Sequence, residues 1–342
     1  MKEHKCRRTY YKTSFSLITL VTAWILFVTS IWKKDATKAA RESLSLHNSP
    51  SVGIKIYHGW HNMKNNSSGH PVPAIQQVID NTKVYDRYLT VATANMAHID
   101  FVLNWRESVR RHLNTETKLL IISLDDELHA NLVRLEIPTL HVSELFNMES
   151  QDQNNLDENS IRMEQQYGTS TYNRLVNMKI DIAYILLRYY NLDYLVYTDV
   201  DVVWLQPNLF DYFDILFQRK ENVQDFDILF SSSGRETFYP CTGFYVARKS
   251  DFSVQYLDSI LSSPEKQVAH DQIIATQVFE QLTADQKLRI YPLPGHLFMD
   301  GSTLEWRKSY NIQPWIFHAN YVVGFEGKRQ MLTDAGYWYI NT

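Results

Sequence analysis

The stretch that decides the fold is LDYLVYTDVDVVWLQPNLF, residues 192–210. Its apolar, β-rich start at residues 194–198 predicts a buried central strand, and extended structure is expected to continue to residue 204. Asp199 and Asp201 follow directly on the buried part. On extended backbone, side chains two residues apart point to the same side. The two carboxylates are therefore expected to lie together.

Paired carboxylates suit a metal ion. Like charges this close are unfavourable unless a positive charge lies between them. A hard divalent cation, Mn²⁺ or Mg²⁺, prefers oxygen ligands and leaves coordination positions open for phosphate oxygens. The alternative is structural, because aspartate is also favoured in turns and caps at strand ends. The pair alone leaves both interpretations open, and its place after a buried strand favours the metal.

Strands and helices alternate on both sides of this stretch. A long amphipathic helix is expected over residues 172–190, and further strands over residues 88–95, 118–125, 227–232 and 244–250. This alternation predicts an α/β domain with a largely parallel sheet over residues 86–342. Such sheets bind ligands at the carboxyl ends of their strands, which is where the two aspartates lie.

The amino-terminal segment is of another kind. Residues 15–32 carry no charge and are flanked by lysines. At about 1.5 Å per residue, a helix of this length spans roughly 27 Å, enough for a thin bilayer. The basic residues before it favour a cytoplasmic tail over residues 1–14. A cleaved signal peptide is the alternative, but its apolar region is shorter and ends in small residues. We expect a single-pass type II signal anchor in the Golgi membrane.

A lumenal stem is expected over residues 33–85, which are rich in Ser, Asn, His and Pro and show little periodicity. Asn65 and Asn66 each begin an N-glycosylation pattern there. The two cysteines, Cys6 and Cys241, would lie on opposite sides of the membrane and cannot pair. The fold is therefore expected to depend on its hydrophobic core.

The charge distribution argues against nucleic acid as a partner. The chain has 34 Lys and Arg against 38 Asp and Glu, a formal net charge of −4. Because the basic residues gather before residue 35, the folded body is more acidic than the whole chain. It lacks the basic patch that nucleic-acid binding requires.

From about residue 88 onward, the chain carries several separate blocks that recur together in one family. They are VATANMAHIDFVLNW, NRLVNMKID, TDVDVVWLQP, TGFYVARKS, HDQ, LPGHLFMDG and HANYVVGFEGKRQML. In this order they resemble the nucleotide-diphospho-sugar transferase family that includes the plant rhamnogalacturonan xylosyltransferases and, more distantly, the glycogenin-like transferases. The resemblance implies a GT-A fold, a Mn²⁺-dependent nucleotide-sugar donor and transfer with retention of configuration.

The resemblance implies a metal and diphosphate site. Asp199 and Asp201 match the family's DxD metal ligands, and His318 matches the C-terminal histidine that completes the metal shell. Gly324 and Lys328 match the residues that approach the diphosphate leaving group. Imidazole alongside carboxylates is a coherent donor set for such a metal. The alternatives are a structural histidine and a solvated surface lysine.

Donor-binding residues also carry over from the resemblance. Thr93, Ala94 and Asn95 match the strand end where the family seats the nucleoside, although Asn95 is also a good helix N-cap. Lys179 matches a basic residue in the helix before the DxD, where it contacts the donor or extends its charged end to solvent.

Near the reacting sugar, the resemblance implies roles for Asp271 and Gln272. A carboxylate or amide there stabilises positive charge on the anomeric carbon or acts as a transient nucleophile. A front-face route, in which the departing phosphate deprotonates the acceptor, is equally open. Thr242 and Gly243 resemble the sugar-contacting turn, but Cys241 stands where the family commonly has Asn.

The sequence thus predicts an enzyme that moves a sugar, xylose or galactose by resemblance, from a UDP-sugar to a hydroxyl of a glycan or glycoprotein. A catalytically silent binder of nucleotide sugars or glycans on the same scaffold is the alternative, because fold does not fix function. Cys241 is the residue that supports this alternative. A metal-dependent hydrolase ranks third, since no dedicated water-activating base stands out.

Overall fold

The computed structural model describes residues 72–113, 119–146, 169–218, 225–232 and 238–340. The expected tail, membrane anchor and glycosylation motifs lie outside these ranges, as does most of the expected stem. Among the described helices, none combines the length and the apolar character needed to cross a bilayer.

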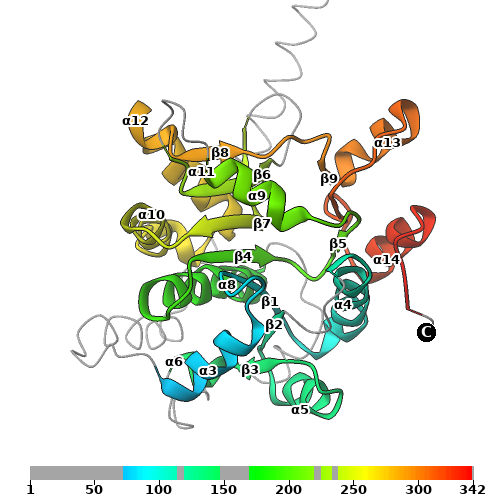
Figure 1. The fold of residues 1–342 in the computed structure, drawn as a ribbon, viewed down its shortest axis with the longest axis horizontal. Helices are drawn as coiled ribbons and strands as arrows, with labels where there is room; N and C mark the ends of the chain where they lie inside the picture. Colours follow the sequence, from blue (N-terminus) through cyan, green and yellow to red (C-terminus); the bar gives the residue numbers. More distant parts are fainter. Residues whose placement is uncertain (1–71, 114–118, 147–168, 219–224, 233–237, 341–342) are drawn as a thin grey trace, which may run out of the picture. The chain divides into compact units, whose positions relative to one another are not determined.

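A seven-stranded sheet with the order β3-β2-β1-β4-β7-β6-β8 forms the centre of the domain (Figure 1). The pairs β3-β2, β2-β1, β1-β4 and β6-β8 are parallel, and β7 runs antiparallel to both of its neighbours. The expected α/β fold with a mainly parallel sheet is confirmed. The strands are β1 (Tyr88–Ala94), β2 (Leu120–Ser123), β3 (Thr139–His141), β4 (Tyr194–Thr198), β6 (Ile228–Ser232), β7 (Pro240–Arg248) and β8 (Ile290–Pro292).

A smaller sheet of three strands has the order β5-β10-β9 and joins distant parts of the chain. It consists of β5 (Val202–Trp204), β9 (Phe298–Asp300) and β10 (Ile316–His318). Strand β10 runs antiparallel to β5 and parallel to β9. The expectation of one extended segment over residues 194–204 is therefore wrong. A turn separates β4 from β5, because aspartates favour turns and β5 finds its partner in β10.

Helices cover both faces of the main sheet. Helices α8 (Ser170–Tyr189), α10 (Asp251–Leu261) and α11 (Asp271–Gln281) pack on one another, with α8 against β4 and α11 against β7. The core that includes Val196 of β4 and Val246 of β7 also holds apolar residues of α4 (Ile99–Leu113), α9 (Leu209–Phe217) and the smaller sheet. Cover on two faces explains why β1, β2 and β4 are near-continuous apolar runs.

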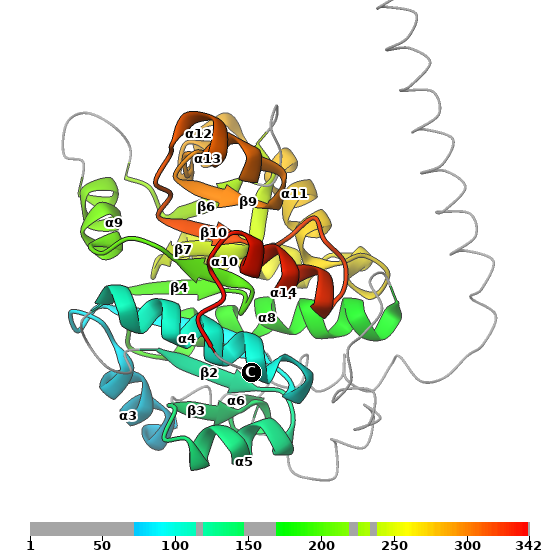
Figure 2. The same ribbon diagram turned by 90° about the vertical axis from the view of Figure 1, so that its right-hand side faces the viewer.

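Shorter elements complete the domain, and Figure 2, turned by 90° from Figure 1, labels the α-helices among them. They are α5 (Asp126–Arg134), α6 (Val142–Phe146), α12 (Ala284–Lys287), α13 (Leu304–Tyr310), α14 (Phe325–Asp334), and the 3₁₀ turns η1 (Met96–His98), η3 (Pro264–Gln267) and η4 (Gly301–Thr303).

Helix α3 (Pro73–Thr82) falls within the stretch 33–85 that the sequence assigns to a stem. Ile75 and Ile79 on this helix are buried, and the Lys83 ammonium just after it donates to the carbonyl of Asn191 at 3.1 Å. From residue 73 onward, the chain therefore packs on the domain. The helix has too few turns for its apolar spacing to stand out in the sequence.

Candidate active site

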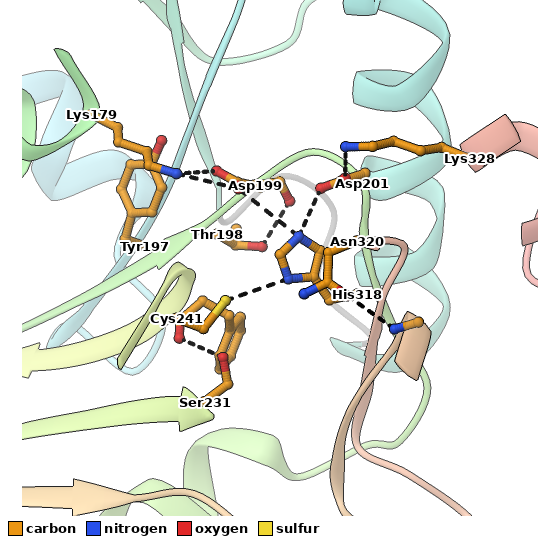
Figure 3. Close-up of polar contacts among 12 residues, drawn as sticks. Lys179, Tyr197, Thr198, Asp199, Asp201, Ser231, Cys241, His318, Asn320 and Lys328 are labelled. Atoms are coloured by element: carbon orange, nitrogen blue, oxygen red, sulfur yellow. Dashed lines mark hydrogen bonds and ion pairs between the residues drawn. The ribbon is translucent and has the colours of Figure 1, made fainter. Parts of the chain in front are cut away.

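Two carboxylates and one imidazole meet beyond the end of β4. Asp199, Asp201 and His318 each offer a ligand atom, and these atoms all lie within 4.8 Å of one another (Figure 3). The His318 Nε2 atom lies 3.3 Å from Oδ1 of Asp201 and 3.9 Å from Oδ2 of Asp199. Asp201 and His318 are buried, and Asp199 is partly exposed. The cluster therefore has one side that a ligand can approach.

Backbone hydrogen bonds fix the two aspartates. The amide of Asp199 donates to the carbonyl of Gly243 at 2.7 Å, and the amide of Val202 donates back to the Asp199 carbonyl at 3.2 Å. The Asp201 carbonyl accepts from the amide of Ala319 at 3.0 Å, next to His318. The carboxylates therefore converge through a turn, and not through the strand alternation that the sequence suggested.

The pairing of β5 with β10 brings in the imidazole. In that antiparallel pair, His318 lies opposite Val202, the residue that follows Asp201. An antiparallel ladder places opposite residues within contact distance. A histidine remote in sequence is thereby held beside the aspartates.

Each aspartate also has its own lysine. The Lys328 Nζ atom, on the first turn of α14, lies 2.6 Å from Oδ2 of Asp201. The Lys179 Nζ atom, on α8, lies 3.4 Å from both carboxylate oxygens of Asp199. Gly324 caps α14 with a φ of 86°, a conformation that favours glycine.

The close packing of these charges shifts their pKa values. Burial raises the pKa of Asp201, but Lys328 and His318 outweigh it and hold this pKa well below its usual range. Burial lowers the pKa of His318, but Asp201 outweighs it and raises the pKa to about 10. The pKa of Asp199 is raised, because burial outweighs the effect of Lys179. The imidazole of the metal-free site is therefore a cation at neutral pH.

This donor set fits a divalent cation. Carboxylate oxygens and an imidazole nitrogen are ligands that Mn²⁺ and related metals accept. A metal would take the place of the proton on Nε2 of His318, because histidine binds metals in its neutral form. Three protein ligands leave coordination positions for a substrate. Within the described part of the chain, this is the one group of three or more His, Cys, Asp and Glu residues with such spacing.

Strand β7 forms the wall behind the cluster. A Cβ atom on Gly243 would lie 2.4 Å from Cε1 of His318 and 2.7 Å from Oδ2 of Asp199, so only glycine leaves room for both ligands. Thr242 is buried beside it, and Cys241 places Sγ 3.7 Å from Nδ1 of His318. Thr242 and Gly243 lie inside the strand, whereas the resemblance implied a turn.

Asp271 and Gln272, the two residues predicted for the sugar site, differ in their surroundings. Asp271, at the start of α11, is buried, and its Oδ2 atom lies 2.8 Å from Nζ of Lys179. Lys179 thus connects Asp271 with Asp199. The side chain of Gln272 is partly exposed and forms no hydrogen bond with another described residue.

The predicted nucleoside residues lie at the end of β1, the strand beside β4. Thr93 Oγ1 lies 2.7 Å from the hydroxyl oxygen of Tyr197, and Ala94 is buried. The side chain of Asn95 bonds to the ring of His98 and does not cap η1. Strands β2 and β4 lie on opposite sides of β1, and ligands bind α/β sheets at such a position.

Two tyrosines under the cluster are not among the predicted site residues. Tyr197 of β4 lies opposite Tyr245 of β7, with ring centroids 5.4 Å apart. The Lys179 Nζ atom lies 6.0 Å from the centroid of Tyr197. The Tyr245 hydroxyl is buried and has no hydrogen-bond partner among the described residues. Strand alternation could have placed both rings on one face, but the pairing of β4 with β7 is not legible in the sequence.

The chain resembles known glycosyltransferases. It is 22% identical over 298 residues to UDP-galactose:fucoside alpha-3-galactosyltransferase of Dictyostelium discoideum. The aligned residues cover 78% of this chain and 44% of that protein. The chain thus spans less than half the length of this relative. Glycosyltransferase GlyE of Streptococcus pneumoniae matches with 12% identity and a TM-score of 0.42, covering 75% of this chain and 61% of GlyE. Mouse xyloside xylosyltransferase 1 matches with 13% identity and a TM-score of 0.41, and the match covers 70% of this chain and 99% of the mouse protein.

Both TM-scores lie below 0.5, so the assignment rests on sequence. The profile of the nucleotide-diphospho-sugar transferases matches residues 114–332, more than half of the chain. This range includes Lys179, Asp199, Asp201, His318 and Lys328. The chain therefore belongs to the nucleotide-diphospho-sugar transferase family.

Proposed function

We propose that this protein is a metal-dependent glycosyltransferase that uses a UDP-sugar donor and retains the anomeric configuration. The observation that carries the proposal is the cluster of Asp199, Asp201 and His318 at the switch point of an α/β sheet. Bound there, Mn²⁺ or Mg²⁺ would neutralise charge on the diphosphate and so make it a better leaving group.

The lysines have separate roles in this proposal. Lys328 extends from the first turn of α14, whose N-terminus is formed by Gly324. A helix N-terminus with a nearby lysine favours phosphate oxygens. With a metal ion held by Asp201, Lys328 would be free to bind the diphosphate.

Asp271 is the carboxylate that the family resemblance assigns to the sugar site, and Lys179 connects it with Asp199 of the cluster. Its contact with Lys179, at 2.8 Å, holds the buried carboxylate in one orientation. An ionised carboxylate can stabilise positive charge on the anomeric carbon or attack it from the face opposite the leaving group. The front-face route needs only the first of these roles, and both routes give retention.

Galactose is the donor sugar that the comparison supports. The curated relative is a UDP-galactose:fucoside galactosyltransferase, at 22% identity. We propose UDP-galactose first and UDP-xylose second, with a hydroxyl of a glycan or glycoprotein as acceptor. Cys241 does not weaken this proposal, because it contacts the imidazole of the metal cluster.

A Golgi location with a type II anchor remains part of the proposal. It rests on the uncharged segment 15–32, its basic upstream flank and the glycosylation patterns at Asn65 and Asn66.

Thermal unfolding of the purified full chain with UDP, with and without Mn²⁺, tests the proposed function. We expect UDP to raise the midpoint only when Mn²⁺ is present. Asp201→Asn should abolish this rise, while the variant still folds and gives a measurable unfolding midpoint without ligand. Asp285→Asn, which removes an exposed carboxylate on α12, should behave as wild type. Stabilisation by UDP without metal, or in Asp201→Asn, would contradict the proposal.

Turnover then identifies the donor. A panel of UDP-sugars, incubated with Mn²⁺ and simple glycoside acceptors, should release UDP with one sugar above the others. Nuclear magnetic resonance of the product should show the anomeric configuration of the donor. An inverted product would refute the retaining mechanism while leaving the metal site intact.

A further inference from the structure

The imidazole of His318 has polar neighbours at both of its nitrogens. Nε2 faces the carboxylates, at 3.3 Å from Asp201 and 3.9 Å from Asp199. Nδ1 faces the sulfur of Cys241 at 3.7 Å, a contact within hydrogen-bonding range for sulfur. Both residues are buried, at 2% and 7% exposure for Cys241 and His318. Water is thus a poor substitute for this contact.

The placement of Cys241 follows from the sheet. It lies in β7, two residues before Gly243, whose carbonyl holds the amide of Asp199. The missing side chain at Gly243 lets the imidazole lie against the strand, and Cys241 then meets its far edge. Sγ does not belong to the group of ligand atoms within 4.8 Å of one another. The thiol is therefore a neighbour of the ligand and not itself a ligand.

A histidine that binds a metal through one nitrogen usually donates the N–H of the other to a fixed acceptor. That bond selects the tautomer and holds the ring in place. A thiol sulfur is a weak but sufficient acceptor. In the described structure, Cys241 is the residue that occupies this position at Nδ1 (Figure 3).

We propose that Cys241 is the positioning residue of the metal centre: its Sγ accepts the Nδ1–H of His318 and so presents the Nε2 lone pair to the metal. This inference rests on the proposed metal site. It gives a role to the residue at which the chain departs from the Asn common in its family.

The test measures Mn²⁺ binding to the full chain without nucleotide, by electron paramagnetic resonance of the free ion. Cys241→Ala should weaken binding about tenfold, at the lower end of the range for such outer partners because sulfur is a weak acceptor. Cys241→Ser restores an acceptor and should stay within about threefold of wild type. Ser231→Ala is the matched control, because this buried hydroxyl donates to the Phe244 carbonyl on the adjacent strand and, among the described residues, to no other group.

A double-mutant cycle separates positioning from packing. In a His318→Asn background there is no imidazole to orient, so Cys241→Ala should weaken the residual Mn²⁺ binding no further. The absorption spectrum of bound Co²⁺ should change in Cys241→Ala and be preserved in Cys241→Ser. If Cys241→Ala fails to fold, Cys241→Val, which fills the space of the thiol without offering an acceptor, should still bind Mn²⁺ about tenfold more weakly than Cys241→Ser.

The outcomes are distinct. A wild-type chain that binds no Mn²⁺ refutes the proposed metal site itself. A wild-type chain that binds Mn²⁺ while Cys241→Ala binds it equally refutes only the role of Cys241. Equal losses in Cys241→Ala, Cys241→Ser and Ser231→Ala, or a further loss in the His318→Asn background, would show that Cys241 acts through packing alone.

Discussion

The Lys179 Nζ atom lies 2.8 Å from Oδ2 of Asp271, in a buried ion pair that joins helices α8 and α11. The side chains are 8% and 4% exposed. Desolvation makes such a pair costly to form and costlier to break, because removing one partner leaves a buried charge uncompensated. The pair therefore couples the stability of the domain to the geometry of its candidate site.

Lys179→Met should lower the free energy of unfolding by about 3–5 kcal/mol, because Asp271 is left without its cation. Lys179→Met/Asp271→Asn should recover part of this loss. Arg110→Met, which breaks an exposed pair with Glu107, should cost no more than about 1 kcal/mol. Urea unfolding measures all three. Equal costs for Lys179→Met and Arg110→Met would contradict the buried-pair interpretation.

Lys328→Gln should tighten Mn²⁺ binding in the absence of nucleotide. The ammonium lies 2.6 Å from Oδ2 of Asp201 and competes with the metal for that carboxylate. With screening close to that of water, two like charges about 4 Å apart repel by about 1 kcal/mol, so removing the ammonium should raise the Mn²⁺ affinity about fivefold. The same variant should lose much of the stabilisation by UDP with Mn²⁺, because a phosphate-binding cation is gone.

The control for this prediction is Arg329→Gln, which removes the same charge from the same helix at a residue stacked on Trp338. Arg329→Gln should change neither the Mn²⁺ affinity without nucleotide nor the stabilisation by UDP with Mn²⁺ by more than about twofold. Weaker Mn²⁺ binding in nucleotide-free Lys328→Gln would show that the lysine does not compete with the metal.

Mn²⁺ affinity should rise with pH because the metal displaces a proton from His318, whose pKa Asp201 raises to about 10 against the effect of burial. Between about pH 6.5 and 8.5 the gain approaches tenfold per unit. The metal-free fold has the opposite dependence. A raised histidine pKa stabilises the folded state fully below the unfolded value of 6.5, and this contribution is lost as pH rises toward about 10.

Mn²⁺ titrations across this pH range measure how the affinity depends on pH, and urea unfolding measures how the stability of the metal-free protein depends on it. His318→Asn should flatten both the slope of Mn²⁺ affinity and the slope of stability, whereas His296→Asn, at an exposed histidine, should leave both as in wild type. An affinity for Mn²⁺ that does not change with pH would show that His318 is not a ligand.

Gly243→Ala should reduce Mn²⁺ affinity more than about tenfold, because its Cβ would displace His318 and the Asp199 carboxylate. Overpacking should also cost about 1–3 kcal/mol of stability. Gly295→Ala is the matched control, since no atom lies within 4 Å of its added Cβ. Calorimetric titration with Mn²⁺ and urea unfolding distinguish the two. Unchanged Mn²⁺ binding in Gly243→Ala would refute the assigned site.

The main sheet and part of the candidate site could be predicted from sequence because their signals are local. Strand β4 is a continuous apolar run, and its aspartates stand next to it. The lysine of α8 and the histidine of β10 came from the resemblance alone. No local pattern shows that a three-residue strand at residue 202 pairs with another at residue 316.

Other features depend on contacts between distant segments. The stacked rings of Tyr197 and Tyr245 require the antiparallel pairing of β4 with β7. The contact of Cys241 with His318 requires both sheets at once. Burial of α3 depends on its neighbours, including the carbonyl of Asn191. Sequence spacing carries no information about such pairings.

The placement of β10 has a consequence for biosynthesis. Asp199 and Asp201 leave the ribosome well before the strand that carries His318. Until residues 316–318 have been synthesised and have paired with β5, a nascent chain holds the two aspartates without the histidine. Binding of a divalent ion by all three residues would therefore require a chain in which β10 has already joined the smaller sheet.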